Sequence, residues 1–167
     1  MTQYKPAKVW TLGDYYRDPG LRGACHAIKN GDIVTMRSLV MDFIDLFQNS
    51  PPKDCVLVPV PSLSGHNETF CRLLGDGLGI PVRDNILKRS DKYGSLYDMK
   101  QKGITPTEAL TGIQPGRGDL PKETIILVDN VIATGVSVSA SIAAIGRPCE
   151  ALCVAVDWNT YSRSINK

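Results

Sequence analysis

The segment Asp129 to Ser137 combines an acid, a glycine and two hydroxyl residues directly after a hydrophobic run, Thr124 to Val128. Backbone N–H groups in a turn that opens a helix carry partial positive charge and suit a phosphate. Gly135 lets the backbone come close to such a ligand, and the hydroxyls of Thr134 and Ser137 add donors. The pattern predicts a phosphate-binding loop at the carboxyl end of a strand, where ligands collect in open α/β sheets.

Asp129 stands at the start of this loop, about one sugar's length from the predicted phosphate position. Its carboxylate could therefore bind the hydroxyls of a ribose. The alternative is an ordinary turn between a strand and a helix, in which Gly135 serves only the backbone geometry and Asp129 is a cap.

Buried strands and amphipathic helices must position this loop. Continuous apolar runs without alternation indicate strands that are covered on both faces, as in a parallel sheet. Such runs occupy Cys55 to Val60, Thr124 to Val128 and Ala151 to Val156, and a further strand is predicted from Val9 to Tyr16. Helices are predicted from Leu21 to Ile28, from Asp32 to Phe47, from Phe70 to Leu78 and from Val136 to Ile145. This alternation predicts an α/β fold with a mainly parallel β-sheet flanked by helices.

The stretch from about Lys88 to Leu120 shows neither pattern, apart from a hint of a helical turn from Thr107 to Leu110. Long irregular segments inside a domain are usually lids or binding loops. The stretch is therefore predicted to be a flexible lid whose cations approach a ligand, the alternative being a solvated charged face.

Composition and charge narrow the class of protein. A chain of 167 residues has the length of one domain. A net charge of +2 makes nucleic acid an unlikely partner. No run approaches the roughly 20 apolar residues of a membrane helix, and no apolar signal-peptide core follows the opening residues, so a cytoplasmic location is expected. The five scattered cysteines form no Cys-x-x-Cys pair and are predicted to be buried thiols.

The loop and its strand, residues 125–137, closely resemble the 5-phosphoribosyl-1-pyrophosphate (PRPP) motif of type I phosphoribosyltransferases. The segment Val58 to Glu68 resembles the strand and pyrophosphate loop of that family, especially of its ComF-like competence branch. Tyr16 to Gly23 and His26 to Lys29 resemble the N-terminal part of the same branch. The Cys-rich N-terminal segment of that branch is not found in this sequence.

The resemblance implies a single phosphoribosyltransferase-like domain over residues 1–167, with a hood formed by its N- and C-terminal segments. The implied activity transfers 5-phosphoribosyl from PRPP to a nitrogen of a nucleobase-like acceptor, with release of pyrophosphate, as in nucleoside salvage. It implies Mg²⁺ held mainly through PRPP, and a homodimer is common in the family. Trp158 would stack on the acceptor base, the alternative being a plain packing role.

The resemblance also assigns roles within the site. The catalytic residues beside the ribose would be Asp129 and Asn130. The 5-phosphate would be bound by Ala133, Thr134, Gly135, Val136 and Ser137. The pyrophosphate would be bound by Pro61, Ser62, Ser64, Gly65 and His66. The lid would include Lys88, Arg89, Lys92 and Tyr93.

Two positions depart from the family pattern. Asn130 stands where the family usually has a second acid, and it lacks the negative charge that would favour a cationic ribosyl transition state. Ala133 stands where purine-salvage members carry a general-base Asp. An alternative function therefore stays open, a catalytically weakened PRPP- or nucleotide-binding module that acts in regulation or DNA uptake.

Overall fold

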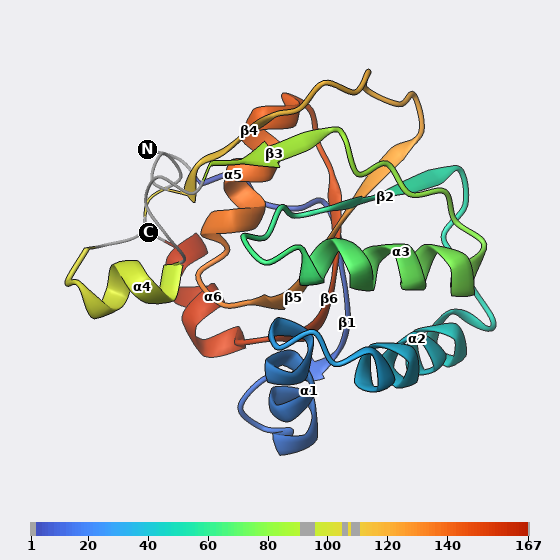
Figure 1. The fold of residues 1–167 in the computed structure, drawn as a ribbon, viewed down its shortest axis with the longest axis horizontal. Coiled ribbons are helices and arrows are strands. Elements are labelled where there is room, and N and C mark those ends of the chain that lie inside the picture. The colour runs from blue at the N-terminus through green and yellow to red at the C-terminus, as the bar shows by residue number, and fades with distance from the viewer. Residues whose placement is uncertain (1–2, 91–95, 105–106, 108–110, 167) are drawn as a thin grey trace.

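The computed structural model describes residues 3–90, 96–104, 107 and 111–166 (Figure 1). A four-stranded sheet lies at its centre with the strand order β1-β6-β5-β2. These strands span Val9–Asp14 (β1), Glu150–Val156 (β6), Thr124–Ile132 (β5) and Cys55–Pro59 (β2). All neighbouring pairs in this sheet are parallel. The predicted α/β class with a mainly parallel sheet is therefore confirmed.

Helices cover both faces of the sheet (Figure 1). One face carries α1 (Pro19–Lys29), α2 (Ile33–Phe47) and α3 (His66–Leu78). The other carries α5 (Val136–Ile145) and a two-stranded antiparallel sheet of β3 (Leu87–Arg89) and β4 (Ile113–Pro115).

The direction in which the chain winds reverses between β2 and β5. After β2 the chain passes through α3 to Val82, which forms a parallel bridge with Leu57 on the side of β2 away from β5. After β5 it passes through α5 to β6, on the other side of β5. The carboxyl ends of β2 and β5 therefore flank a topological switch point, which is where ligands bind in open α/β sheets.

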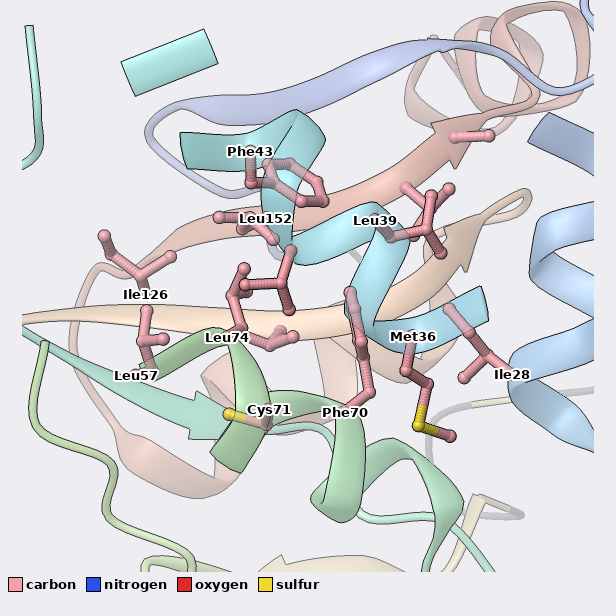
Figure 2. Packing of buried hydrophobic residues seen from close by; sticks show 14 of the residues in the cluster. Ile28, Met36, Leu39, Phe43, Leu57, Phe70, Cys71, Leu74, Ile126 and Leu152 are labelled. Atoms are coloured by element: carbon pink, nitrogen blue, oxygen red, sulfur yellow. The ribbon is translucent and has the colours of Figure 1, made fainter. Parts of the chain in front are cut away.

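The larger core lies between the sheet and helices α1 to α3 (Figure 2). Consecutive strand residues point to opposite faces, so each buried strand supplies side chains to both cores. This explains the apolar runs without alternation. The labelled side chains in Figure 2 come from α1, α2, α3, β2, β5 and β6 and are each at most 4 % exposed: Ile28, Met36, Leu39, Phe43, Phe70, Cys71, Leu74, Leu57, Ile126 and Leu152.

Several helix ends follow local sequence signals, although α3 begins at His66, four residues before the predicted Phe70. The carboxylate of Asp32 accepts a hydrogen bond from the N–H of Thr35 and caps α2. Gly79 and Gly146, with φ of +68° and +80°, end α3 and α5. All five cysteines are buried and free, which confirms their prediction.

The first strand is shorter than predicted. It ends at Asp14 and not at Tyr16, because the Asp14 carboxylate accepts hydrogen bonds from the N–H groups of Tyr16 and Arg17 and so turns the chain. The next turn places Asp18 at the start of α1, where its carboxylate accepts from the N–H groups of Gly20 and Leu21.

Several elements were not predicted. The stretch 88–120 was interpreted as irregular but contains most of β3, α4 (Leu96–Gln101) and β4. The helical turn suggested at its centre falls largely on residues 108–110, outside the described residues. After β6 the chain forms α6 (Trp158–Ile165). Among the described helices, none has the length and apolar character needed to span a membrane.

Candidate functional site

Two helices begin with the same backbone geometry at neighbouring strands. Gly65, after β2, has φ of +80° and precedes α3, while Gly135, after β5, has φ of +79° and precedes α5. Both N-cap residues are glycines and provide no side-chain cap, and the first N–H of each helix, at His66 and Val136, donates to the hydroxyl oxygen of Ser64 and Thr134. The first N–H groups of a helix have no acceptor within the helix and carry partial positive charge. The carboxyl edge of the sheet thus presents two helix ends whose partial positive charge suits an anion.

The loop between β2 and α3 is held in shape by its own hydrogen bonds. The Glu68 carboxylate accepts from the N–H of Ser62 at 2.6 Å and from its hydroxyl at 2.7 Å. The Ser62 hydroxyl oxygen accepts from the N–H of Gly65 at 3.1 Å, and that of Ser64 accepts from the N–H of His66 at 3.2 Å. These hydrogen bonds within the loop define its conformation.

The imidazole of His66 packs on the turn between α1 and α2. Its Nδ1 lies 2.8 Å from the carbonyl oxygen of Lys29, and because a carbonyl only accepts, Nδ1 donates. A Cβ placed on Gly31 would lie 2.8 Å from Nε2. Both ring nitrogens of His66 thus face this turn.

Charged groups from separate elements converge around Asp129. The pairing of β2 with β5 ends at Val128, one residue earlier, so Asp129 lies beside the loop that follows β2. Burial raises the pKa of Asp129 to about 6, while the nearby cations of Lys29 and Arg89 lower it and the Glu68 carboxylate raises it. The cations Lys29 and Arg89 come from α1 and β3, and the carboxylates Asp129 and Glu68 come from β5 and α3.

Arg89 reaches the same loop from β3. Its Nη1 donates to the carbonyl oxygen of Pro61 at 3.4 Å. Burial lowers the pKa of the Arg89 guanidinium, and the charges of Asp129 and Glu68 raise it. Lys88, the preceding residue, is exposed. Lys92 and Tyr93, also assigned to the lid, lie outside the described residues.

Asn130 is a buried residue, 8 % exposed. Its Oδ1 accepts a hydrogen bond from the N–H of Val131 at 2.9 Å. Its carbonyl oxygen accepts from the thiol of Cys25 at 3.5 Å, and burial raises the pKa of that thiol to about 12. Asn130 is therefore tied to its own strand and to α1.

The loop between β5 and α5 is covered by segments from both ends of the chain. The carbonyl oxygen of Thr134 accepts hydrogen bonds from Nε2 of Gln3 at 2.8 Å and from the hydroxyl of Ser164 at 2.7 Å. A Cβ on Gly135 would lie 2.8 Å from Cε2 of Tyr161 and 2.7 Å from Nε2 of Gln3.

This packing corrects the reason given for Gly135. The missing side chain accommodates Tyr161 and Gln3, in addition to the positive φ, and does not leave open space for a ligand. The other members of the predicted loop are half-buried, namely Ala133, Thr134, Val136 and Ser137. The N–H groups at the start of α5 remain the feature suited to a phosphate.

Trp158 is the first residue of α6, at the carboxyl end of β6. Its side chain is 42 % exposed, and its ring centroid lies 6.2 Å from that of Tyr161. An exposed aromatic at the carboxyl edge of the sheet can accept a stacking partner.

Lys29 and Glu68 were not identified from the sequence. A signal for Glu68 was present, because a Glu three residues after a helix-capping position often accepts from backbone N–H groups before the helix. Lys29 had no comparable signal, since its place beside Asp129 results from the packing of α1 against β5.

No family model and no curated protein matches this chain. Some solved structures are similar to this chain at low sequence identity. One is phosphoribosylpyrophosphate synthetase from Mycobacterium smegmatis, at 15 % identity over 72 % of this chain and 32 % of that one, with a TM-score of 0.41. Another is adenine phosphoribosyl transferase from Trypanosoma brucei, in complex with AMP, pyrophosphate and ribose-5-phosphate. It has 15 % identity over 75 % of this chain and 65 % of that one, with a TM-score of 0.47.

A third is hypoxanthine phosphoribosyltransferase from Trypanosoma cruzi, in complex with the product IMP. It has 16 % identity over 78 % of this chain and 66 % of that one, with a TM-score of 0.40. The chain thus spans about a third of the length of the synthetase and about two thirds of the length of the two transferases.

Proposed function

We propose that this chain is a single-domain phosphoribosyltransferase, which moves the 5-phosphoribosyl group of PRPP to a nitrogen of a nucleobase-like acceptor and releases pyrophosphate. One observation carries the proposal: two helices start after glycines of positive φ, Gly65 and Gly135, at neighbouring strands, with Asp129 near the carboxyl end of one of these strands. PRPP has the matching chemistry, because a ribose separates its phosphate from its pyrophosphate.

The two loops differ in what they offer to an anion. We assign the 5-phosphate to the N–H groups of residues 133–137 and the pyrophosphate to the loop of residues 61–65. Arg89, whose guanidinium donates a hydrogen bond to the carbonyl oxygen of Pro61, places a cation beside the loop of residues 61–65. The group with more negative charge is therefore assigned to that loop.

Asp129 would stabilise the ribose as the bond between C1 and the pyrophosphate oxygen breaks. This step builds positive charge on the ribose and negative charge on the leaving group. With a pKa of about 6, Asp129 is mostly ionised at neutral pH and can both accept from ribose hydroxyls and favour the developing cation. Arg89 would stabilise the charge on the departing pyrophosphate.

The donor groups at the site are compatible with Mg²⁺ held mainly by substrate. No cluster of three or more potential metal ligands is present among the described residues. Asp129 offers a carboxylate with one oxygen, Oδ1, that accepts from the N–H of Asn130, whereas both oxygens of Glu68 accept from Ser62. One carboxylate, phosphate oxygens and water are a donor set that Mg²⁺ accepts. The ion would neutralise charge on the pyrophosphate.

Trp158 is our candidate for contact with the acceptor. It is exposed at the end of β6, next to the strand that carries Asp129. A planar base stacked on this ring would lie at the sheet edge where the ribose is proposed. A packing role against Tyr161 is the alternative.

A binding module is a second candidate because of Asn130. A buried amide, hydrogen-bonded to Val131, supplies no second negative charge beside the ribose. Such a chain would bind PRPP without turning it over and would act through a partner.

The test measures binding and turnover on the same preparation. Calorimetry with PRPP and Mg²⁺ should give saturable binding, and pyrophosphate release should appear with at least one of a panel of purine and pyrimidine bases. Binding without release from any base would favour the binding module. Absence of PRPP binding would refute both candidates.

A further inference from the structure

We infer that Lys29 binds the pyrophosphate group and that His66 is the residue that positions it. This inference rests on the proposed function and extends the site beyond the loops to the end of α1. The resemblance to the family assigned His66 to the pyrophosphate itself.

The geometry connects the last residue of α1 to the first residue of α3. The Nδ1–H of His66 donates to the carbonyl oxygen of Lys29 at 2.8 Å, across 37 positions of sequence. Gly31 completes the contact, because any side chain at this position would collide with the imidazole. The backbone of Lys29 is therefore fixed beside Gly65, where α3 begins.

The charge of Lys29 is available to a ligand. Its side chain is exposed, and its ammonium group forms no ion pair with any residue the structure describes. The backbone contact with His66 holds Lys29 at the start of α3, and its positive charge lowers the pKa of both Asp129 and Cys25. A flexible side chain with three donors can adapt to a phosphate as a point charge.

Lys29 would add a second positive charge to that of Arg89. Pyrophosphate carries several negative charges, and Arg89 is already bonded to the carbonyl of Pro61. Lys29 approaches from the face covered by α1, whereas β3, which carries Arg89, lies on the face covered by α5. The two cations would hold the pyrophosphate from opposite faces of the sheet.

The first test removes the charge of Lys29. Calorimetric titrations of the full chain would use inorganic pyrophosphate with Mg²⁺ and, separately, ribose 5-phosphate. We expect Lys29→Gln to weaken pyrophosphate binding at least tenfold and to leave ribose 5-phosphate affinity within twofold. The matched control is Lys53→Gln, which removes an exposed lysine at the amino end of β2 and should change neither affinity by more than twofold.

Two outcomes would overturn the inference. If wild type binds pyrophosphate and Lys29→Gln retains that affinity within twofold, Lys29 is not a binding residue, although the proposed function survives. If wild type binds neither pyrophosphate nor ribose 5-phosphate, the proposed function fails together with the inference.

A double-mutant cycle tests the positioning role of His66. If His66 acts through Lys29, His66→Ala should weaken pyrophosphate binding several-fold in the wild-type background and not at all beside Lys29→Gln. A merely structural role would weaken binding equally in both backgrounds and would refute positioning. Should His66→Ala not fold, His66→Leu, which keeps a side chain of similar size and removes the Nδ1 donor, takes its place in the same cycle with the same expected outcome.

Discussion

The carboxylate of Glu68 accepts hydrogen bonds from both the backbone N–H and the hydroxyl of Ser62, at 2.6 and 2.7 Å. Glu68 lies in the first turn of α3 and Ser62 just after β2, so the contact closes the intervening loop. A loop held in this way loses little conformational freedom when an anion binds. The Glu68 carboxylate would repel an anion bound at the proposed site, but the N–H and hydroxyl of Ser62 donate to it and offset part of this repulsion.

Removing this contact should destabilise the protein. We expect Glu68→Ala to lower the free energy of unfolding by about 1–3 kcal/mol, because a partly buried donor pair at Ser62 loses its acceptor. Urea denaturation measures the change. The control is Asp76→Ala, which removes an exposed carboxylate from the same helix and should stay within about 0.5 kcal/mol. Equal effects of the two substitutions would contradict the structural role of Glu68.

The sheet and its helices could be predicted because their signals are local. β2, β5 and β6 are apolar runs, and Gly79 and Gly146 end their helices where the sequence places them. By contrast, β3 and β4 have three residues each, too short for a periodic pattern. Helix α6 was missed although Trp158, Tyr161 and Ile165 have helical spacing, because the residues between them are polar.

The site was predicted in outline and not in its contacts. The loops after β2 and β5 are adjacent because their strands pair, which follows from the fold class. The contacts of Gln3 with Thr134 and of His66 with Lys29 join residues 131 and 37 positions apart. No local pattern encodes such contacts, since they depend on how whole elements pack.

Substitutions of the two glycines that flank α5 distinguish the cost of lost packing from the cost of backbone strain. Gly135 and Gly146 have φ of +79° and +80°, but an added Cβ would have neighbours within 4 Å at Gly135 and none at Gly146. We expect Gly146→Ala to cost about 1–2 kcal/mol from strain alone. Gly135→Ala should cost about 1–3 kcal/mol more, because the methyl group collides with Tyr161 and Gln3. Equal losses in urea denaturation would show that this packing is unimportant.

The pKa of Asp129 predicts a pH-dependent stability. Burial raises this pKa from 3.8 to about 6, so the folded state binds the proton more tightly than the unfolded chain. The resulting stability is present below pH 3.8 and is lost as the pH rises through about 6. Relative to Asp129→Asn, which does not titrate, wild type should lose about 1–3 kcal/mol between about pH 4 and pH 7. Parallel stability curves for the two proteins would contradict this.

Two buried asparagines should respond differently to an acidic substitution. Asn130 accepts from the N–H of Val131, and a carboxylate can keep that bond. Asn67 donates from Nδ2 to the carbonyl oxygens of Val60 and Val128, which a carboxylate would repel. At about pH 7 we expect Asn130→Asp to cost about 1–3 kcal/mol, and Asn67→Asp to cost more. Urea denaturation ranks them, and the opposite order would refute these hydrogen-bond assignments.

Asn130→Asp also distinguishes the transferase from the binding module. If the chain is a transferase, the added carboxylate should leave PRPP affinity within about tenfold, near 1.4 kcal/mol, and preserve or raise the rate of pyrophosphate release by favouring the ribosyl cation. If it is a binding module, wild type should bind PRPP without turnover, and Asn130→Asp should gain measurable release. Asp129→Asn serves as the comparison, since it removes the carboxylate proposed beside the ribose and should weaken PRPP binding in either case. PRPP binding unchanged by both substitutions would refute the placement of the ribose at the end of β5.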